Sequence, residues 1–150
     1  YQFIRLGFEG YKAIHSSCME IAKYLHSQIG KMQPFRNYST EVHNPLFIWE
    51  MKPEHAKNCK WTLYDLQDKL KQNGWMVPAY TMPANIESTV VMRIVVRQGF
   101  SRDMADQLLT DIAAAVADLE KLQYPTPTRI AADNKMKVKS TIFTHTGKGK

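Results

Sequence analysis

The sequence predicts an α+β domain, in which a small antiparallel sheet of about three strands is covered by three helices and followed by a flexible basic C-terminal tail. Apolar residues recur at spacings of three and four in three long segments, which predicts helices. Short runs rich in valine, isoleucine and aromatic residues lie between prolines and glycines, which predicts strands. The chain has 150 residues, enough for one domain with a hydrophobic core. We expect the domain to span residues 1–124 and the tail to span residues 125–150.

The first helix is predicted up to about Met32, because Pro34 forbids continuation. Its apolar stripe consists of Tyr11, Ile14, Cys18, Ile21, Leu25, Ile29 and Met32. The segment 46–51 (LFIWEM), bounded by Pro45 and Pro53, predicts a short strand.

The second helix begins with a capping box, in which Thr62 and Asp65 can each bond the other's backbone. Leu63, Leu66 and Leu70 form its stripe, and Gly74 favours its end. The segment 75–80 is then expected to be extended, with a loop reaching residue 89.

The third helix is predicted to start after Ser101, a favoured N-cap residue. Its stripe consists of Met104, Leu108, Ile112, Ala115, Leu119 and Leu122, and Pro125 and Pro127 are expected to end it. Residues 128–150 have no sustained pattern except the apolar pair at 142–143.

The segment 90–97 predicts a strand that carries two arginines. Side chains alternate along a strand, so Arg93 and Arg97 share one face with Val91 and Val95, while the opposite face is wholly apolar and is expected to pack on the core. A guanidinium stays charged and needs an anionic partner when it is covered. For Arg93 that partner is either Glu50 on a neighbouring strand or a carboxylate or phosphate of a ligand.

The formal net charge of +6 is concentrated in the tail: residues 129–150 carry +5 and residues 1–128 carry +1. A basic tail on a nearly neutral body is more typical of a solvated end than of a nucleic-acid interface, so we expect no nucleic-acid partner. No apolar run approaches the roughly 20 residues of a membrane span, and no signal peptide opens the sequence. Cys18 and Cys59 have no disulfide or metal-site spacing, which favours a cytoplasmic location.

No nucleophile elbow, phosphate-binding glycine loop or zinc-binding motif is present, so the sequence contains no recognisable catalytic or metal constellation. His15 and His26 lie off the first helical stripe, and His43 and His55 fall in expected loops. All four are interpreted as solvent-facing. The chain opens without a methionine on apolar residues, and we interpret it as a piece of a longer protein.

Five sequence blocks, taken in order, resemble glutamate decarboxylase, and specifically the C-terminal part of the bacterial enzyme. They are residues 1–7 (YQFIRLG) with 9–11 (EGY), 61–66 (WTLYDL), 74–80 (GWMVPAY), 90–94 (VVMRI) and 97–100 (RQGF), and a sixth match follows at 143–146 (FTHT). The resemblance implies the small C-terminal domain of a pyridoxal-phosphate enzyme of the aspartate-aminotransferase fold class. That family converts L-glutamate to 4-aminobutyrate and carbon dioxide. The whole enzyme is expected to be a homo-oligomer, either a dimer or a larger assembly.

The resemblance also implies residue roles. Arg93 matches the strand arginine that holds the substrate's α-carboxylate, and Arg97 is interpreted as part of the scaffold. The lysine that attaches the cofactor follows a histidine in the family's large domain, and no His-Lys dipeptide occurs here. We therefore expect no catalytic residue and no bound pyridoxal phosphate in this chain alone, whose partner is its own large domain.

His145 matches the penultimate histidine of enteric bacterial relatives, which enters the active site near neutral pH and shuts the enzyme down. Histidine titrates in this range, so the match implies an autoinhibitory switch in an acid-resistance enzyme. Residues 147–150 (GKGK) extend beyond the family's usual end, and they either hold His145 out of the site or dock in its place. Plant relatives bind calmodulin through a basic helix with tryptophan. This tail has no tryptophan after Trp75, so calmodulin is not expected.

Two alternatives remain open: the small domain of another pyridoxal-phosphate decarboxylase, and an interaction module with a basic tail and no catalysis. The blocks at 62–66 and 90–93 argue against the first. The nearly neutral body argues against the second.

Overall fold

The computed structural model describes residues 1–142, with side chains up to residue 135, and it confirms the α+β class. The predictions for His145 and for residues 147–150 lie outside the described residues. Within that described part, five helices accompany one four-stranded antiparallel sheet. The elements are α1 (Gln2–Lys31), β1 (Phe35–Asn37), β2 (Leu46–Met51), α2 (Pro53–Asn58), α3 (Leu63–Gln72), β3 (Ala79–Thr81), β4 (Val90–Val95), α4 (Arg102–Glu120) and α5 (Pro127–Ile142).

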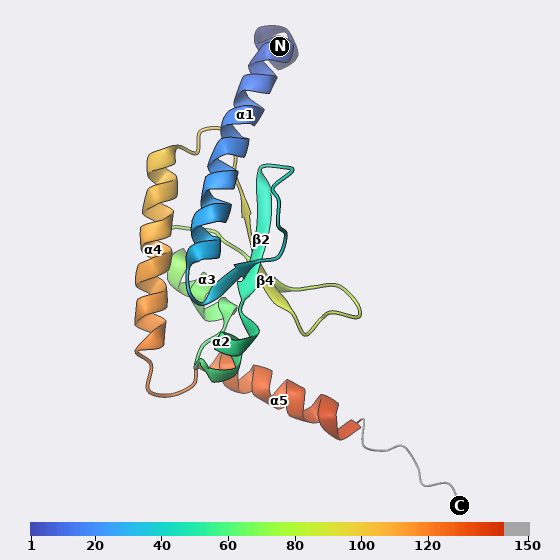
Figure 1. Cartoon of the computed structure of the whole chain (residues 1–150), viewed down its shortest axis with the longest axis vertical. Coiled ribbons are helices and arrows are strands. Elements are labelled where there is room, and N and C mark those ends of the chain that lie inside the picture. The colour runs from blue at the N-terminus through green and yellow to red at the C-terminus, as the bar shows by residue number, and fades with distance from the viewer. Residues whose placement is uncertain (143–150) are drawn as a thin grey trace, which may run out of the picture.

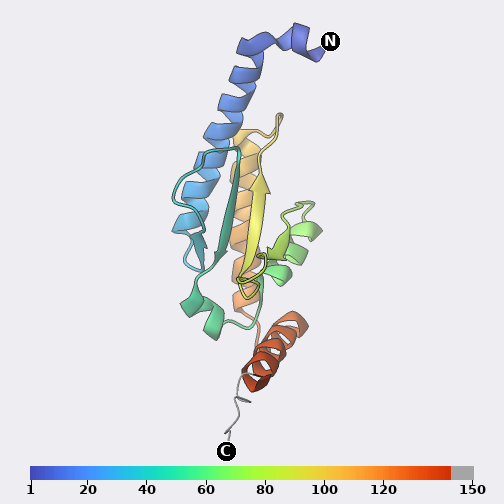
Figure 2. The same cartoon turned by 90° about the vertical axis from the view of Figure 1, so that its right-hand side faces the viewer.

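The strands lie in the order β1-β2-β4-β3, with every neighbouring pair antiparallel. Helices α1 and α4 cover one face of this sheet, and α3 packs beside β3 and β4 (Figure 1). The other face, which is turned toward the viewer in Figure 2, has none of the described helices lying across it.

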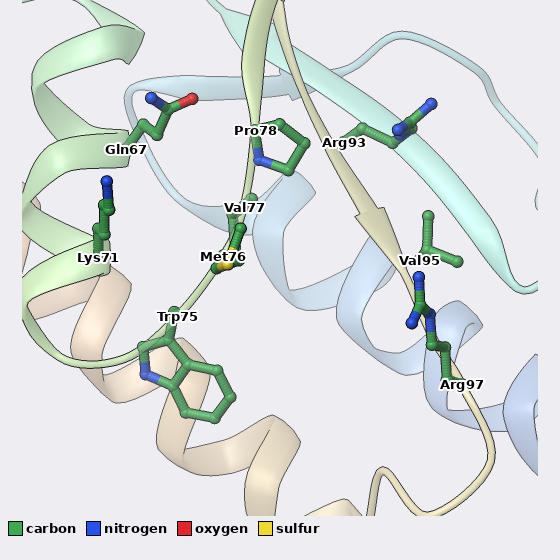
Figure 3. Close-up of a pocket in the computed structure, with 9 residues that line it drawn as sticks. All are labelled: Gln67, Lys71, Trp75, Met76, Val77, Pro78, Arg93, Val95 and Arg97. Atoms are coloured by element: carbon green, nitrogen blue, oxygen red, sulfur yellow. The ribbon is translucent and has the colours of Figure 1, made fainter.

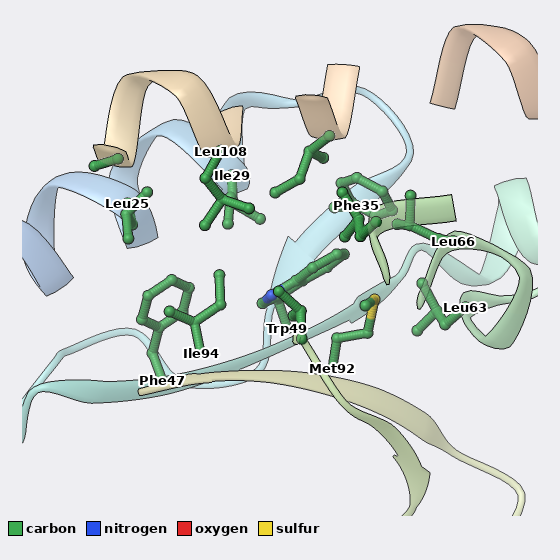
Figure 4. Close-up of a cluster of buried hydrophobic side chains, with 14 of the residues drawn as sticks. Leu25, Ile29, Phe35, Phe47, Trp49, Leu63, Leu66, Met92, Ile94 and Leu108 are labelled. Carbon is green, nitrogen blue, oxygen red and sulfur yellow. The ribbon is translucent and has the colours of Figure 1, made fainter. Parts of the chain in front are cut away.

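The hydrophobic core fills the space between the helices and the covered face (Figure 4). Met92 and Ile94 point into it from β4 and Phe47 and Trp49 from β2, as alternation along a strand requires. The helices contribute the predicted stripe residues, among them Leu25, Ile29, Leu66, Leu108 and Ile112, all nearly or fully buried. The prediction that the even-numbered face of strand 90–97 packs on the core is confirmed.

Helix α1 is longer than predicted and is broken at Gly7, whose φ of 57° and ψ of −172° lie outside the helical region. Glycine adopts a positive φ without steric cost, so the break falls where the sequence permits it. Gly30, near the other end of α1, lies against the side chain of Asn37, where a Cβ would meet the amide nitrogen at 2.6 Å. Glycine at this position therefore lets β1 pack closely on the helix.

Three elements differ from the sequence prediction. Strand β1 adds a fourth strand at the sheet edge, and its three residues are too few to show a period. Pro53 and Pro127 were interpreted only as stops, but each lies at the start of a helix, where its fixed φ and missing N–H are tolerated. Helix α5 therefore occupies residues that the prediction assigned to the tail.

None of the helices in the described part of the chain is long and apolar enough to span a membrane.

Candidate functional site

Arg93 lies on the open face of the sheet, exposed, in the middle of β4. Its direct neighbour on β2 is Ile48, and its backbone N–H donates to the carbonyl of Pro78 at 3.1 Å. The next pair along the same face is Leu46, which is 40% exposed, and Val95, which is 49% exposed. The direct cross-strand neighbours of Arg93 and Val95 are thus apolar.

A cavity of about 570 Å³ opens beside Arg93 (Figure 3). Helix α3 contributes Gln67 and Lys71, the segment after it contributes residues 75–78, and β4 and its continuation contribute Arg93, Val95 and Arg97. Three of these lining residues are cations and none is an acid. Such a lining attracts anions, and low-dielectric walls strengthen the attraction.

Two hydrogen bonds fix the walls of this cavity. The Gln67 side-chain oxygen accepts from the backbone N–H of Ala79 at 2.7 Å, which ties α3 to the start of β3. The indole N–H of Trp75 donates to Asp111 on α4 at 2.6 Å. The cavity is therefore built from elements that the fold holds in place, which is what positioning a small ligand requires.

The internal partner that the sequence offered for Arg93 is engaged elsewhere. Glu50 accepts from Arg36 on β1, whose Nε and Nη2 both lie 2.8 Å from Oε1. Arg93 forms no ion pair with any residue whose side chain the structure describes, and its guanidinium lies 5.7 Å from the centre of the Tyr80 ring. Glu50 is thus paired with Arg36, and a ligand as the partner of Arg93 stays a prediction.

The histidines fall into three environments. His15 and His43 are exposed, as predicted. His26 is half-buried and bonds the carbonyl of Ser39 at 2.9 Å. His55 lies in α2 rather than in a loop, and its Nε2 is 2.7 Å from the carboxylate of Glu120, so the solvent-facing interpretation was wrong for it.

Sequence reasoning missed Lys71 and the contribution of Arg97 to the cavity. Lys71 lies on the polar side of α3, where a lysine is unremarkable in sequence, and only the packing of α3 beside β4 brings it to the site. Arg97 follows the end of β4 and lines the same cavity as Arg93. Its interpretation as scaffold stays a prediction.

The lining of the cavity suits a small anion. Its cations could hold an anion, but the only lysine in the lining, Lys71, is exposed rather than enclosed in a pocket. Among the described residues no cluster of three or more histidine, cysteine or acidic side chains could hold a metal ion.

Comparison of the sequence with known proteins finds relatives among both plant and bacterial glutamate decarboxylases. Glutamate decarboxylase 5 of Arabidopsis thaliana is 40% identical over 131 residues, which is 87% of this chain and 25% of the relative. Glutamate decarboxylase of Aliivibrio fischeri is 42% identical over 117 residues, 77% of this chain and again 25% of the relative. The chain thus spans about a quarter of the length of these relatives and matches a C-terminal portion of them. No family model matches the chain.

Comparison of the structures agrees. Glutamate decarboxylase of Lactobacillus brevis superposes with a TM-score of 0.76 at 36% identity, over 82% of this chain and 27% of that protein. Tryptophan decarboxylase of Catharanthus roseus superposes with a TM-score of 0.65 at 14% identity, over 78% of this chain and 24% of that protein, which shows a shared fold alone.

Proposed function

We propose that this chain, which corresponds to a C-terminal portion of glutamate decarboxylases, is the small domain of such an enzyme and supplies the arginine that holds the substrate. The reaction converts L-glutamate and a proton to 4-aminobutyrate and carbon dioxide. The observation that supports the proposal most directly is Arg93, exposed at a cationic cavity and without a carboxylate partner among the described side chains.

A guanidinium suits this task because its planar donors can bind both oxygens of a carboxylate at once. In the proposed complex Arg93 holds the α-carboxylate, and so fixes the orientation of the bond that breaks. Pyridoxal phosphate, when bound, supplies an electron-accepting ring that takes up the electron pair of that bond. Arg97 and Lys71 add positive charge around the entrance and raise the local concentration of the anionic substrate.

The cofactor would be held by the part of the enzyme outside this chain, as the length of the relatives suggests. In the same proposal the complete enzyme is a cytoplasmic homo-oligomer. Glutamate is favoured over an aromatic substrate because the identity to glutamate decarboxylases is 36–42% in the matches above and that to the tryptophan enzyme is 14%.

Substitution of Arg93 in the full-length enzyme tests the proposal. Arg93→Met should lower kcat/KM for L-glutamate about 100-fold, the loss expected when a charged hydrogen-bonded pair worth about 3 kcal/mol is removed. Arg93→Lys keeps the charge but loses the planar fork, and should lower kcat/KM about tenfold. Arg102→Lys, an exposed arginine on α4, is the control and should leave kinetics unchanged. Unaltered turnover in Arg93→Lys and Arg93→Met would refute the role.

The proposal also assigns His145 as a pH-dependent inhibitor that closes the site near neutral pH, where its imidazole loses its proton. In the full-length enzyme, His145→Ala and a truncation from residue 137 onward should both retain activity at neutral pH that the intact enzyme loses. Equal pH–activity profiles for the intact and truncated enzymes would show that the tail has no such role.

A further inference from the structure

We infer that Arg36 is a positioning residue: by holding Glu50, it prevents this carboxylate from pairing with Arg93, and so keeps Arg93 free for the substrate. The inference rests on the proposed function of Arg93. Arg36 itself lies on β1, two strands away from β4 and outside the lining of the cavity.

The register of the sheet places the three charges on one face. Arg36 lies directly across from Glu50, and Glu50 lies directly across from Val91 on β4. Arg93 is two residues further along β4, so it is the diagonal neighbour of Glu50. Diagonal neighbours in an antiparallel pair are about 7–8 Å apart, a separation that long side chains span. Glu50 therefore lies between β1, which carries Arg36, and β4, which carries Arg93.

Burial makes Glu50 dependent on a cation. Its side chain is only 11% exposed, whereas that of Arg36 is 52% exposed. A carboxylate that is largely removed from water and left unpaired is strongly destabilising, so Glu50 will take the cation that reaches it. Arg36 satisfies it now with two donors on one oxygen, Nε and Nη2, each at 2.8 Å.

Without Arg36, Arg93 is the cation on the other strand that flanks β2. The Arg93 side chain would then populate two conformations, one paired with Glu50 and one facing the open cavity. Only the second conformation can bind the substrate carboxylate. The apparent affinity for substrate falls by the fraction of molecules in which Arg93 is free. Once substrate is bound, Arg93 is in place in both enzymes, so kcat should not change.

The test uses the full-length enzyme loaded with pyridoxal phosphate, and measures kcat and KM for L-glutamate. Arg36→Met should raise KM about fivefold and leave kcat within about twofold of the parent value. A fivefold change corresponds to a competing ion pair between Arg93 and Glu50 of about the strength measured at partly exposed sites. The double variant Arg36→Met/Glu50→Gln removes the competing carboxylate and should restore KM. Glu50→Gln alone should leave KM near that of the parent enzyme. Arg102→Met, which removes another exposed arginine that has an acidic partner, is the matched control and should change neither parameter.

Arg36→Gln, which keeps a polar side chain at this half-exposed position, serves as a second variant with the same expectation if Arg36→Met does not fold. An unchanged KM in either folded variant overturns the inference. A raised KM that Glu50→Gln does not restore also overturns it, because Arg36 would then act only by supporting the sheet edge.

Failure of the underlying function is distinguishable from failure of this inference. If Arg93→Lys and Arg93→Met leave kcat/KM unchanged, the role of Arg93 is wrong and the inference falls with it. If they lower kcat/KM while the Arg36 variants behave like the parent enzyme, only the role of Arg36 is wrong.

Discussion

At the scale of single residues, Cys59 is the thiol whose environment alters its chemistry. Burial raises its pKa above the ordinary value of 9.0, although a hydrogen bond to the backbone of Trp61 and the nearby charge of Arg129 act in the opposite direction. The folded chain therefore keeps the proton at a pH where the unfolded chain releases it. This contribution to stability is complete well below the ordinary pKa of 9.0 and is lost as the pH rises through the raised value.

The prediction concerns reactivity. In a Cys18→Ala background, which leaves Cys59 as the only cysteine, alkylation by iodoacetamide should follow the thiolate and show a midpoint above pH 9.0. The rate should be measured from pH 7 to 11, with the urea-unfolded chain as the control for an ordinary thiol. A folded midpoint equal to or below the unfolded one would contradict the effect of burial.

The residues of the site show how far sequence reasoning reached. Alternation and charge were enough to predict that Arg93 needs an anion, because both properties are local. The capture of Glu50 by Arg36 was not predictable, since it depends on the strand β1, which has only three residues and no readable period. Lys71 required knowledge of how α3 packs beside the sheet.

At the scale of elements, one carboxylate joins the starts of two helices. Asp65 Oδ2 accepts from the backbone N–H of Thr62 at 2.7 Å, which is the carboxylate's part of the capping box of α3, and also from the Thr62 hydroxyl at 2.8 Å. The same oxygen accepts from the hydroxyls of Thr126 and Thr128, at 2.9 and 2.6 Å, where α5 begins. The capping box was predicted from sequence and is confirmed, whereas its link to α5 spans more than 60 residues and has no local signal.

Asp65→Ala should therefore destabilise the chain more than the loss of one cap. Loss of a capping interaction costs about 1 kcal/mol, and loss of hydrogen bonds to a charged group costs about 1.5–3 kcal/mol more. We therefore expect the free energy of unfolding, measured with urea, to fall by about 3 kcal/mol. Asp68→Ala, on the exposed side of the same helix, is the control and should change stability by less than about 0.5 kcal/mol. Limited proteolysis between α4 and α5 should accelerate only in the Asp65 variant. Equal stability of the two variants would exclude the link.

The prolines explain why α5 was missed while α4 was predicted. Ser101 precedes a strong apolar stripe, so the start of α4 has two agreeing signals, and the Ser101 hydroxyl accepts from the backbone N–H of Met104 as a cap does. Thr126 followed by Pro127 is also a start signal, but the residues after it have only a weak stripe. A proline in this position can either end one helix or begin the next, and tertiary contacts determine which of the two occurs.

At the scale of the whole molecule, the beginning of α1 projects away from the rest of the chain (Figures 1 and 2). It carries large apolar side chains that the described part of the chain leaves in water: Tyr1, Phe3, Ile4 and Phe8 are 78–91% exposed. Exposed apolar clusters of this kind mark contact surfaces. Because the matched relatives are about four times as long as the region they share with this chain, we expect this arm, residues 1–8, to pack on the remainder of the enzyme.

The arm predicts opposite effects in two contexts. In the full-length enzyme, Ile4→Asp/Phe8→Asp should lower stability by about 4 kcal/mol, because burial of two such side chains contributes about 1.5–3 kcal/mol each. In the isolated chain the same substitutions remove apolar surface from water, so solubility should rise and the thermal midpoint should change little. Tyr124→Asp, 80% exposed at the other end of the molecule, is the control and should have little effect in the full-length enzyme. Thermal midpoints of the full-length variants should be measured by calorimetry. If Ile4→Asp/Phe8→Asp and Tyr124→Asp give the same midpoint, the arm does not pack on the rest of the full-length enzyme.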